Sequence, residues 1–289
     1  MNKLILGTVQ MGIPYGINNN RGQINISESL AILNEAYNSG IRTLDTAEAY
    51  GDAHQVIGEF HKSHPEKRFN IITKLPHTIN HEIIYKVENY LKELEVEKLN
   101  TLLFHSHKTF KENCTNLKQL IDLKRAGVIT NIGVSVYTND EIEDVLNYEE
   151  IDIIQLPFNT FDNVNKRGEI IEKIKQNKKI IHSRSCFLQG LFFQPQDSDK
   201  KIVLELKEEL QNINNISKTY NIDIHQLCLN YCLQQCNIDS VLIGVDNLNQ
   251  LQKNLVNSTK KISQEVISEI NKIKITNLNL LNPSLWNNL

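Results

Sequence analysis

Short apolar runs alternate with longer amphipathic stretches from one end of the chain to the other. The apolar runs are continuous rather than alternating, which is typical of parallel strands that are covered on both faces. They predict strands over residues 4–9, 41–45, 69–74, 99–105, 129–136, 151–156, 179–183 and 239–245. The amphipathic stretches predict helices over residues 27–39, 53–64, 82–94, 116–126, 140–146, 166–176, 202–220, 224–235, 248–256 and 263–273.

Every predicted strand is followed by a helix, and no change in composition marks a domain boundary. The pattern therefore predicts an α/β protein with one domain over residues 1–289. We expect a single (β/α)8 TIM barrel with two additional helices and an apolar C-terminal tail, Leu278 to Leu289. A doubly wound open sheet is the competing architecture. It is disfavoured because no strand–turn–helix unit carries the G-x-G-x-x-G motif.

In such a barrel the chemistry lies at the carboxyl ends of the strands, and neighbouring strand ends here carry suitable side chains. Asp45 ends the second predicted strand and Tyr50 follows it, while Lys74 and His105 end the third and fourth. An Asp45–Lys74 ion pair next to the phenol is expected to lower the pKa of Tyr50 from its ordinary value of about 10. Such a tyrosine can exchange a proton with a carbonyl or alcohol oxygen that His105 orients.

Several segments resemble the aldo-keto reductases in order and in spacing. The quoted segments are Gly7-Thr8, Asp45-Thr46-Ala47-x-x-Tyr50-Gly51, Ile72-Thr73-Lys74, Leu103-Phe104-His105, Gly133-Val134-Ser135, Ile154-Gln155, Gln189-Gly190-Leu191 and Ile243-Gly244…Gln250-Leu251…Asn254. Each segment alone is weakly specific. Their combination on a (β/α)8 pattern is specific, and it runs from about Leu4 to Asn254.

The resemblance implies reversible, NAD(P)H-dependent reduction of an aldehyde or ketone, with a small-molecule carbonyl compound as the substrate. The catalytic residues would be Asp45, Tyr50, Lys74 and His105, with Tyr50 as general acid. Lys74 would lower the pKa of Tyr50, Asp45 would fix Lys74, and His105 would orient the carbonyl. Family habit favours NADPH as the cofactor, with NADH as the alternative.

The resemblance also implies the cofactor site. Ser135 and Gln155 match residues that hold the nicotinamide carboxamide, and Gly7 and Thr8 match contacts near its ribose. The residues that match the adenosine site are Gly244, Asn247, Gln250 and Asn254.

Two positions depart from the family pattern. Arg184 occupies the place where many members stack a tyrosine on the nicotinamide, and a guanidinium plane can also stack on a ring. Asp246 lies in the loop where NADPH-selective members commonly have a base, and its charge would repel a 2′-phosphate if the side chain points inward.

Charge and composition narrow the function further. A net charge of −3 gives no basic field for nucleic acid or an anionic membrane, and no apolar stretch is long enough to span a bilayer. Five cysteines without paired spacing and an N-terminal apolar run too short for a signal peptide favour a cytoplasmic protein. The oligomeric state is left open.

Other candidate features have ordinary structural explanations. The pair His105 and His107 could suggest a metal site, but acidic and histidine partners on other strand ends are not evident, so no metal is expected. Cys228, Cys232 and Cys236 are expected to form a core-facing helical stripe. Trp286 could line the pocket or pack on the barrel exterior. Arg21 and Arg184 could bind a substrate anion, although Arg21 could equally be a solvated loop charge.

The loops expected at the active end are polar and rich in asparagine, which favours a hydroxylated or charged substrate. The segment from Gly7 to Gly16 resembles aldo-keto reductases from bacterial surface-polysaccharide gene clusters. A keto- or aldehydo-sugar, free or nucleotide-linked, is therefore the expected substrate class. The alternative is a cofactor-binding sensor module on the same barrel with little turnover.

Overall fold

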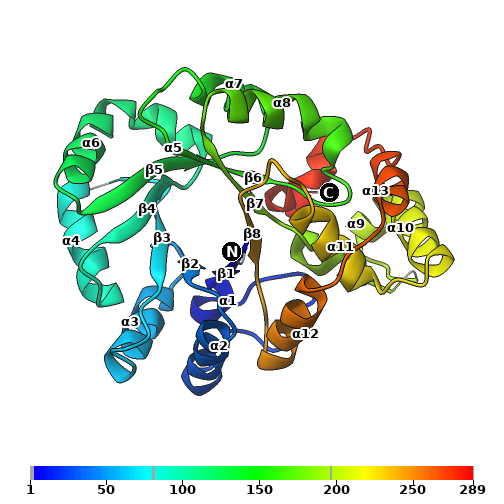
Figure 1. The fold of residues 1–289 in the computed structure, drawn as a ribbon, viewed down its shortest axis with the longest axis horizontal. Helices are drawn as coiled ribbons and strands as arrows, with labels where there is room; N and C mark the ends of the chain where they lie inside the picture. Colours follow the sequence, from blue (N-terminus) through cyan, green and yellow to red (C-terminus); the bar gives the residue numbers. More distant parts are fainter. Residues whose placement is uncertain (1–2, 80–81, 196, 289) are drawn as a thin grey trace.

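The computed structural model describes residues 3–79, 82–195 and 197–288, so the last residue of the predicted tail, Leu289, lies outside the described residues. Eight parallel strands pair in chain order, and β1 pairs with β8 to close a barrel (Figure 1). The strands are β1 Leu4–Gly7, β2 Thr43–Asp45, β3 Asn70–Leu75, β4 Leu99–Phe104, β5 Ile129–Ser135, β6 Ile153–Pro157, β7 Ile180–Arg184 and β8 Ser240–Ile243. The predicted (β/α)8 barrel is confirmed.

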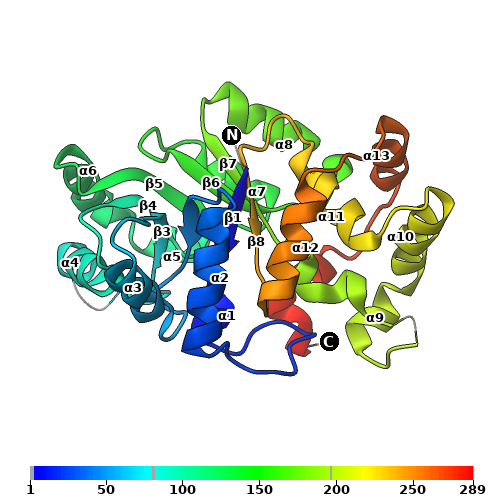
Figure 2. The same cartoon turned by 60° about the horizontal axis from the view of Figure 1, so that its bottom comes forward.

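Helices surround the strands, as Figures 1 and 2 show. The α-helices are α1 Val9–Gly12, α2 Ile26–Asn38, α3 Ala53–Ser63, α4 Ile83–Leu94, α5 His107–Glu112, α6 Leu117–Arg125, α7 Asn139–Val145, α8 Val164–Gln176, α9 Lys201–Glu205, α10 Lys207–Thr219, α11 Ile224–Leu233, α12 Leu248–Ser258 and α13 Gln264–Asn271. Short 3-10 turns are η1 Cys114–Asn116, η2 Leu188–Phe193, η3 Leu278–Leu281 and η4 Pro283–Asn288. None of the helices in the described part of the chain is long and apolar enough to cross a membrane.

The helix boundaries follow local capping more than hydrophobic periodicity. The helix predicted from Ser27 begins at Ile26, because the side chain of Asn25 accepts the backbone N–H of Glu28. The helix predicted over 202–220 is two helices, α9 and α10, which meet at Leu206. The short helices α1 and α5 were not predicted, because a single turn carries too little periodicity to detect.

Two apolar layers hold the barrel together. The larger lies between the strands and the helices, where alternate strand residues such as Leu102 and Phe104 are fully buried. The smaller fills the barrel interior with Ile5, Ile72, Leu103 and Ile153 from four different strands. The interior cluster plugs the barrel, so that a site can open only beyond it, toward the strand ends.

The cysteine stripe is only partly internal. Cys228 and Cys232 are buried on α11, whereas Cys236 lies beyond the end of this helix and is exposed. Trp286 does not line the cavity described below. It packs partly buried against the core, and its indole Nε1 donates to the carbonyl of Leu280 at 2.9 Å.

Candidate active site

Side-chain alternation along the strands places the predicted residues in the barrel mouth. Ile5, Ile72, Leu103 and Ile153 point into the barrel, so the residues two positions further on point the same way. These residues are Gly7, Lys74, His105 and Gln155, and all of them line one cavity at the strand ends. The cavity has a volume of about 1150 Å³.

Most of the predicted site residues line this cavity. They are Gly7, Thr8, Asp45, Tyr50, Lys74, His105, Ser135, Gln155, Arg184, Gly244, Gln250 and Asn254. Asn247 is the exception among them. Its side chain caps α12 by accepting the backbone N–H of Gln250 at 2.9 Å, which gives it a structural task at the edge of the site.

Lys74 is held at the base of the cavity by a dense set of contacts. Its ammonium group forms an ion pair with Asp45 and donates to the carbonyl of Thr46 at 3.0 Å. Both charged side chains are only 2–3% exposed, so each one compensates the buried charge of the other. The second carboxylate oxygen of Asp45 accepts the Nε2 donor of Gln155 at 2.8 Å. The predicted Asp45–Lys74 ion pair is thus present, and the structure adds Gln155, from the end of β6, to it.

Tyr50 lies in the loop after β2, and its hydroxyl is 3.5 Å from the Nζ of Lys74. The loop is anchored by Glu48, whose carboxylate accepts from Lys86 Nζ at 2.9 Å and from the hydroxyl of Tyr90. Both partners lie on α4, and the sequence analysis did not identify this anchor. The i, i+4 spacing of Lys86 and Tyr90 on one helix face was the available signal.

The electrostatics of Tyr50 differ from the expectation. Burial raises the pKa of Tyr50, the Asp45 carboxylate raises it further, and Arg184 opposes the rise. The ammonium of Lys74 does not reverse this direction, since Asp45 already compensates its charge and burial lowers the pKa of Lys74 itself. Tyr50 therefore holds its proton at neutral pH, as a proton donor requires.

His105 is neutral over the physiological range. Burial, followed by the charges of Lys74 and other neighbours, lowers its pKa to about 3. Its ring stacks on His77 with 4.3 Å between the ring centres and packs edge-on against Tyr50 at 5.8 Å. A neutral imidazole keeps one N–H donor and one acceptor, so it can hydrogen-bond an uncharged oxygen. His107 does not join it, because its Nε2 lies 2.8 Å from Asp144 on α7.

Arg184 also lies in the mouth, at the end of β7. Its guanidinium lies over the ring of Tyr137, 4.1 Å from the ring centre, and donates to the carbonyl of Val136 at 3.0 Å. Tyr137 lines the cavity as well, and sequence reasoning missed it. Tyr137 lies two residues beyond Ser135. The side-chain alternation that directs Ser135 into the barrel mouth therefore also predicts that Tyr137 points there. Arg21, in contrast, is an exposed residue paired with Glu28.

The loop after α1 and the C-terminal tail complete the cavity. Figure 2 shows this loop (blue) and the tail (red) at the same end of the barrel. Asn18 and Asn19 of the loop line the cavity together with Asn282 and Ser284 of the tail. The loop contacts the segment after β7 on the other side of the mouth, because Asn18 donates to the carbonyl of Gly190 at 2.6 Å.

Comparisons with known proteins agree with this arrangement. The family model described as "Aldo/keto reductase family" matches residues 3–275. An NADH-specific methylglyoxal reductase from Escherichia coli is 23% identical over 260 residues, which cover 76% of this chain and 79% of that protein. D-arabinose 1-dehydrogenase from Saccharomyces cerevisiae is 24% identical over 251 residues, with 78% and 75% covered.

A solved structure shares the same fold. The aldo-keto reductase AKR11C1 from Bacillus halodurans, in its holo form, superposes with a TM-score of 0.79 at 20% identity, covering 94% of this chain and 91% of that one. Because the family model spans nearly the whole chain, this protein belongs to the aldo/keto reductase family and is an NAD(P)H-dependent oxidoreductase that reduces carbonyl compounds.

Proposed function

We propose that this protein reduces a small, hydroxylated aldehyde or ketone, with Tyr50 as the proton donor to the carbonyl oxygen. The proposal rests on one observation. The hydroxyl of Tyr50, the Asp45–Lys74 ion pair and the ring of His105 all meet at the base of one cavity. The raised pKa of Tyr50 keeps the phenol protonated until a substrate oxygen can accept the proton.

Each neighbour has a distinct role in this proposal. Lys74 stabilises the negative charge that develops on Tyr50 as its proton leaves, and Asp45 holds Lys74 in place. Gln155 fixes the second oxygen of Asp45, so that the carboxylate cannot turn toward Tyr50. His105, which is neutral, hydrogen-bonds the carbonyl oxygen and orients it toward the phenol.

The lining of the cavity fits a nicotinamide dinucleotide. Ser135 and Gln155 provide polar side chains beside the catalytic group, and they are assigned to the nicotinamide carboxamide. Near α12, the buried Oδ1 of Asn254, which also faces His225, lies at the cavity and can accept a donor from the adenosine end. When bound, the reduced dinucleotide supplies the hydride for the carbonyl carbon.

The polar rim supports a hydroxylated substrate. Asn18, Asn19, Asn282 and Ser284 present amides and a hydroxyl around the mouth, and these groups match the donors and acceptors of a sugar. These rim residues therefore support the substrate class expected from the sequence, a keto- or aldehydo-sugar.

The test compares the wild-type protein with Tyr50→Phe. The absorbance of NADH and NADPH is followed with a panel of small aldehydes and keto-sugars, and dinucleotide binding is measured by fluorescence titration. We expect turnover of at least one sugar carbonyl by the wild type and a loss of about 1000-fold or more in Tyr50→Phe, with the dinucleotide Kd unchanged. Equal turnover by the two proteins would remove Tyr50 from the role. Tight dinucleotide binding without any turnover by the wild type would favour a sensor.

A further inference from the structure

Arg184 has unused hydrogen-bonding capacity in the barrel mouth. Its guanidinium donates to Val136 O at 3.0 Å and to Ser185 Oγ at 3.3 Å. A guanidinium has five N–H donors in a planar fork. Within the described ranges no carboxylate lies at ion-pair distance from this group, although the residue is half-buried and lines the cavity. A partly desolvated cation without an acidic partner is unusual in a structural role.

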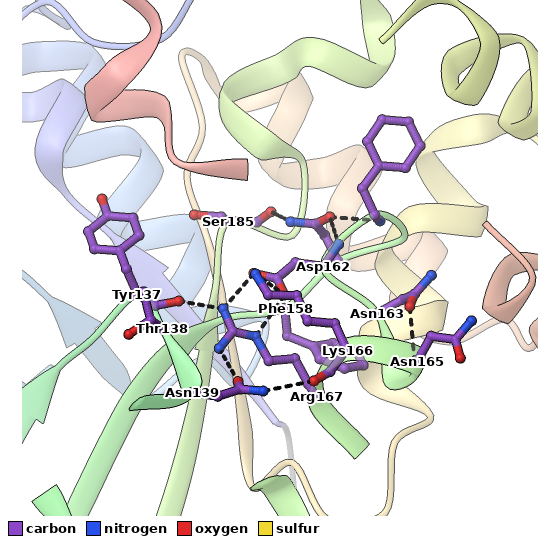
Figure 3. A network of polar contacts seen from close by, with 12 residues as sticks. Tyr137, Thr138, Asn139, Phe158, Asp162, Asn163, Asn165, Lys166, Arg167 and Ser185 are labelled. Atoms are coloured by element: carbon purple, nitrogen blue, oxygen red, sulfur yellow. Dashed lines mark hydrogen bonds and ion pairs between the residues drawn. The ribbon is translucent and has the colours of Figure 1, made fainter. Parts of the chain in front are cut away.

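A second arginine nearby provides the contrast. Arg167 is completely buried, and its Nε and Nη2 donate to the two carboxylate oxygens of Asp162 at 2.7 and 2.8 Å. Its other nitrogen contacts are the side chain of Asn139 and the carbonyl of Tyr137, as Figure 3 shows. Arg167 is therefore satisfied by the protein alone, whereas Arg184 is not.

The network in Figure 3 includes two residues that contact Arg184, namely Tyr137 and Ser185. Arg167 fixes the backbone of Tyr137, whose ring lies against the guanidinium of Arg184 at 4.1 Å. Asn159 donates to the carbonyl of Ser185 at 3.1 Å and so fixes the residue that follows Arg184. The guanidinium is thus pre-organised, which reduces the entropy that binding a ligand would cost.

The charge balance of the cavity also favours an anion. Its described lining contains two carboxylates, Asp45 and Asp246. Asp45 forms the ion pair with Lys74. Asp246, on the loop before α12, accepts a hydrogen bond from the side chain of Gln250. Arg184 lines the same cavity as Tyr50 and His105, and its charge is a minor influence that favours a lower pKa at both residues. An anionic group bound near Arg184 would therefore lie close to the reacting carbonyl.

We propose that Arg184 is a substrate-recognition residue that binds a carboxylate or phosphate group of the carbonyl substrate, through the free N–H edge of a guanidinium supported by Tyr137. A planar fork pairs with either anion through two parallel hydrogen bonds. This inference rests on the proposed carbonyl reduction and specifies the class of substrate. It also gives Arg184 a task other than the stacking on nicotinamide that the family resemblance implied.

The experiment uses two pairs of substrates with the full-length protein. Succinic semialdehyde is compared with butanal, and glyceraldehyde 3-phosphate with glyceraldehyde. We expect the wild type to prefer the anionic member of at least one pair, and the pair concerned distinguishes carboxylate from phosphate. Arg184→Gln should lower kcat/KM for that anionic substrate about 30-fold, mainly through KM, and should lower kcat/KM for its neutral partner at least about tenfold less.

Controls separate the other roles of Arg184. Arg125→Gln removes a surface arginine in the same way and should leave all four substrates unchanged. Arg184→Lys keeps the charge without the planar fork and should retain part of the preference. The Kd of the dinucleotide, measured by fluorescence, should change by less than about twofold in Arg184→Gln.

The outcomes that contradict the inference are specific. It is wrong if the wild type reduces neutral and anionic members equally well, or if Arg184→Gln lowers both members equally. It is also wrong if dinucleotide binding weakens more than about tenfold while the substrate preference persists, since Arg184 would then hold the cofactor. If the wild type oxidises no dinucleotide with any of the four compounds or with the sugar panel, the proposed function itself fails.

Discussion

Asp45 illustrates how a single residue acquires its role from its partners. Both of its carboxylate oxygens are occupied, one by Lys74 and the other by Gln155 at 2.8 Å. The side chain is almost fully buried, so removal of either partner would leave a charged or polar group without compensation. The contacts therefore hold the carboxylate as a fixed anchor for Lys74, which agrees with the proposal that Tyr50 carries the proton chemistry.

Asp246 is the residue for which we predict an effect on cofactor choice. It lines the cavity on the loop before α12, to which we assign the adenosine end. Two bases that lie by this loop or line the cavity are each engaged by an acid. Arg21, which donates to the backbone carbonyl of Asp246, pairs with Glu28 at 3.0 Å, and Lys253 pairs with Asp223 at 3.3 Å. Asp246→Ser should therefore lower the Kd of NADPH about fivefold, because it removes repulsion of the 2′-phosphate.

Fluorescence titrations with both dinucleotides at low ionic strength measure this effect. The Kd of NADH serves as the internal control and should change by less than about twofold. An equal change for the two dinucleotides would place the 2′-position of the ribose away from Asp246.

At the scale of elements, the close approach of α1 to the loop that carries Tyr50 positions the proposed proton donor. A methyl group added at Gly12 would lie 1.7 Å from the carbonyl oxygen of Tyr50 and 2.7 Å from the amide nitrogen of Ala53. Ala53 donates this amide to the same Tyr50 carbonyl at 3.1 Å. The absence of a side chain at Gly12 is therefore what allows α1 and the loop to pack together.

Gly12→Ala should displace this loop. We expect kcat/KM to fall about 100-fold, because a shift of about 1 Å in a catalytic group is sufficient for such a loss. The free energy of unfolding should fall by about 1–3 kcal/mol through overpacking. Steady-state kinetics and urea unfolding measure the two quantities.

Gly168→Ala, in the middle of α8, is the matched control. Its added methyl group would lie 3.3 Å from the side chain of Val164, which can move. This variant should keep full activity and unfold at equal or higher urea concentration. Normal activity of Gly12→Ala would show that the loop adapts without moving the phenol.

At the scale of the whole molecule, two buried histidines whose pKa values are lowered link its stability to pH. His182 is 6% exposed in the barrel interior and His225 is 7% exposed on α11. Burial is the first cause that lowers the pKa of each to about 4. In the unfolded chain both would titrate near the ordinary value of about 6.5.

Between about pH 6.5 and pH 4 the unfolded state therefore binds more protons than the native state, and stability must fall as the pH falls. Each histidine contributes at most about 1.4 kcal/mol per pH unit in this window and nothing to the slope above it. Urea unfolding at several pH values measures the slope. His182→Gln should reduce it by about 1 kcal/mol per pH unit, and an unchanged slope would mean that His182 is protonated in the folded protein.

The sequence by itself determined the barrel and which strand-end residues point into its mouth. Eight continuous apolar runs specified parallel strands, and side-chain alternation then fixed which residues point into the mouth, because both are local properties of the chain. The pairing of Lys74 with Asp45 followed from adjacent strands. The sequence also suggested a role for Arg184, but neither its partners nor its geometry.

Only the tertiary structure decided the contacts between distant loops. The Gln155–Asp45 bond, the Arg184–Tyr137 stack and the close approach of Gly12 to Tyr50 join segments whose separation in the sequence carries no periodic signal. The tertiary structure also decided in which direction the pKa of Tyr50 shifts. Burial and a nearby carboxylate oppose the effect of a nearby lysine, and their balance depends on the three-dimensional surroundings of the phenol.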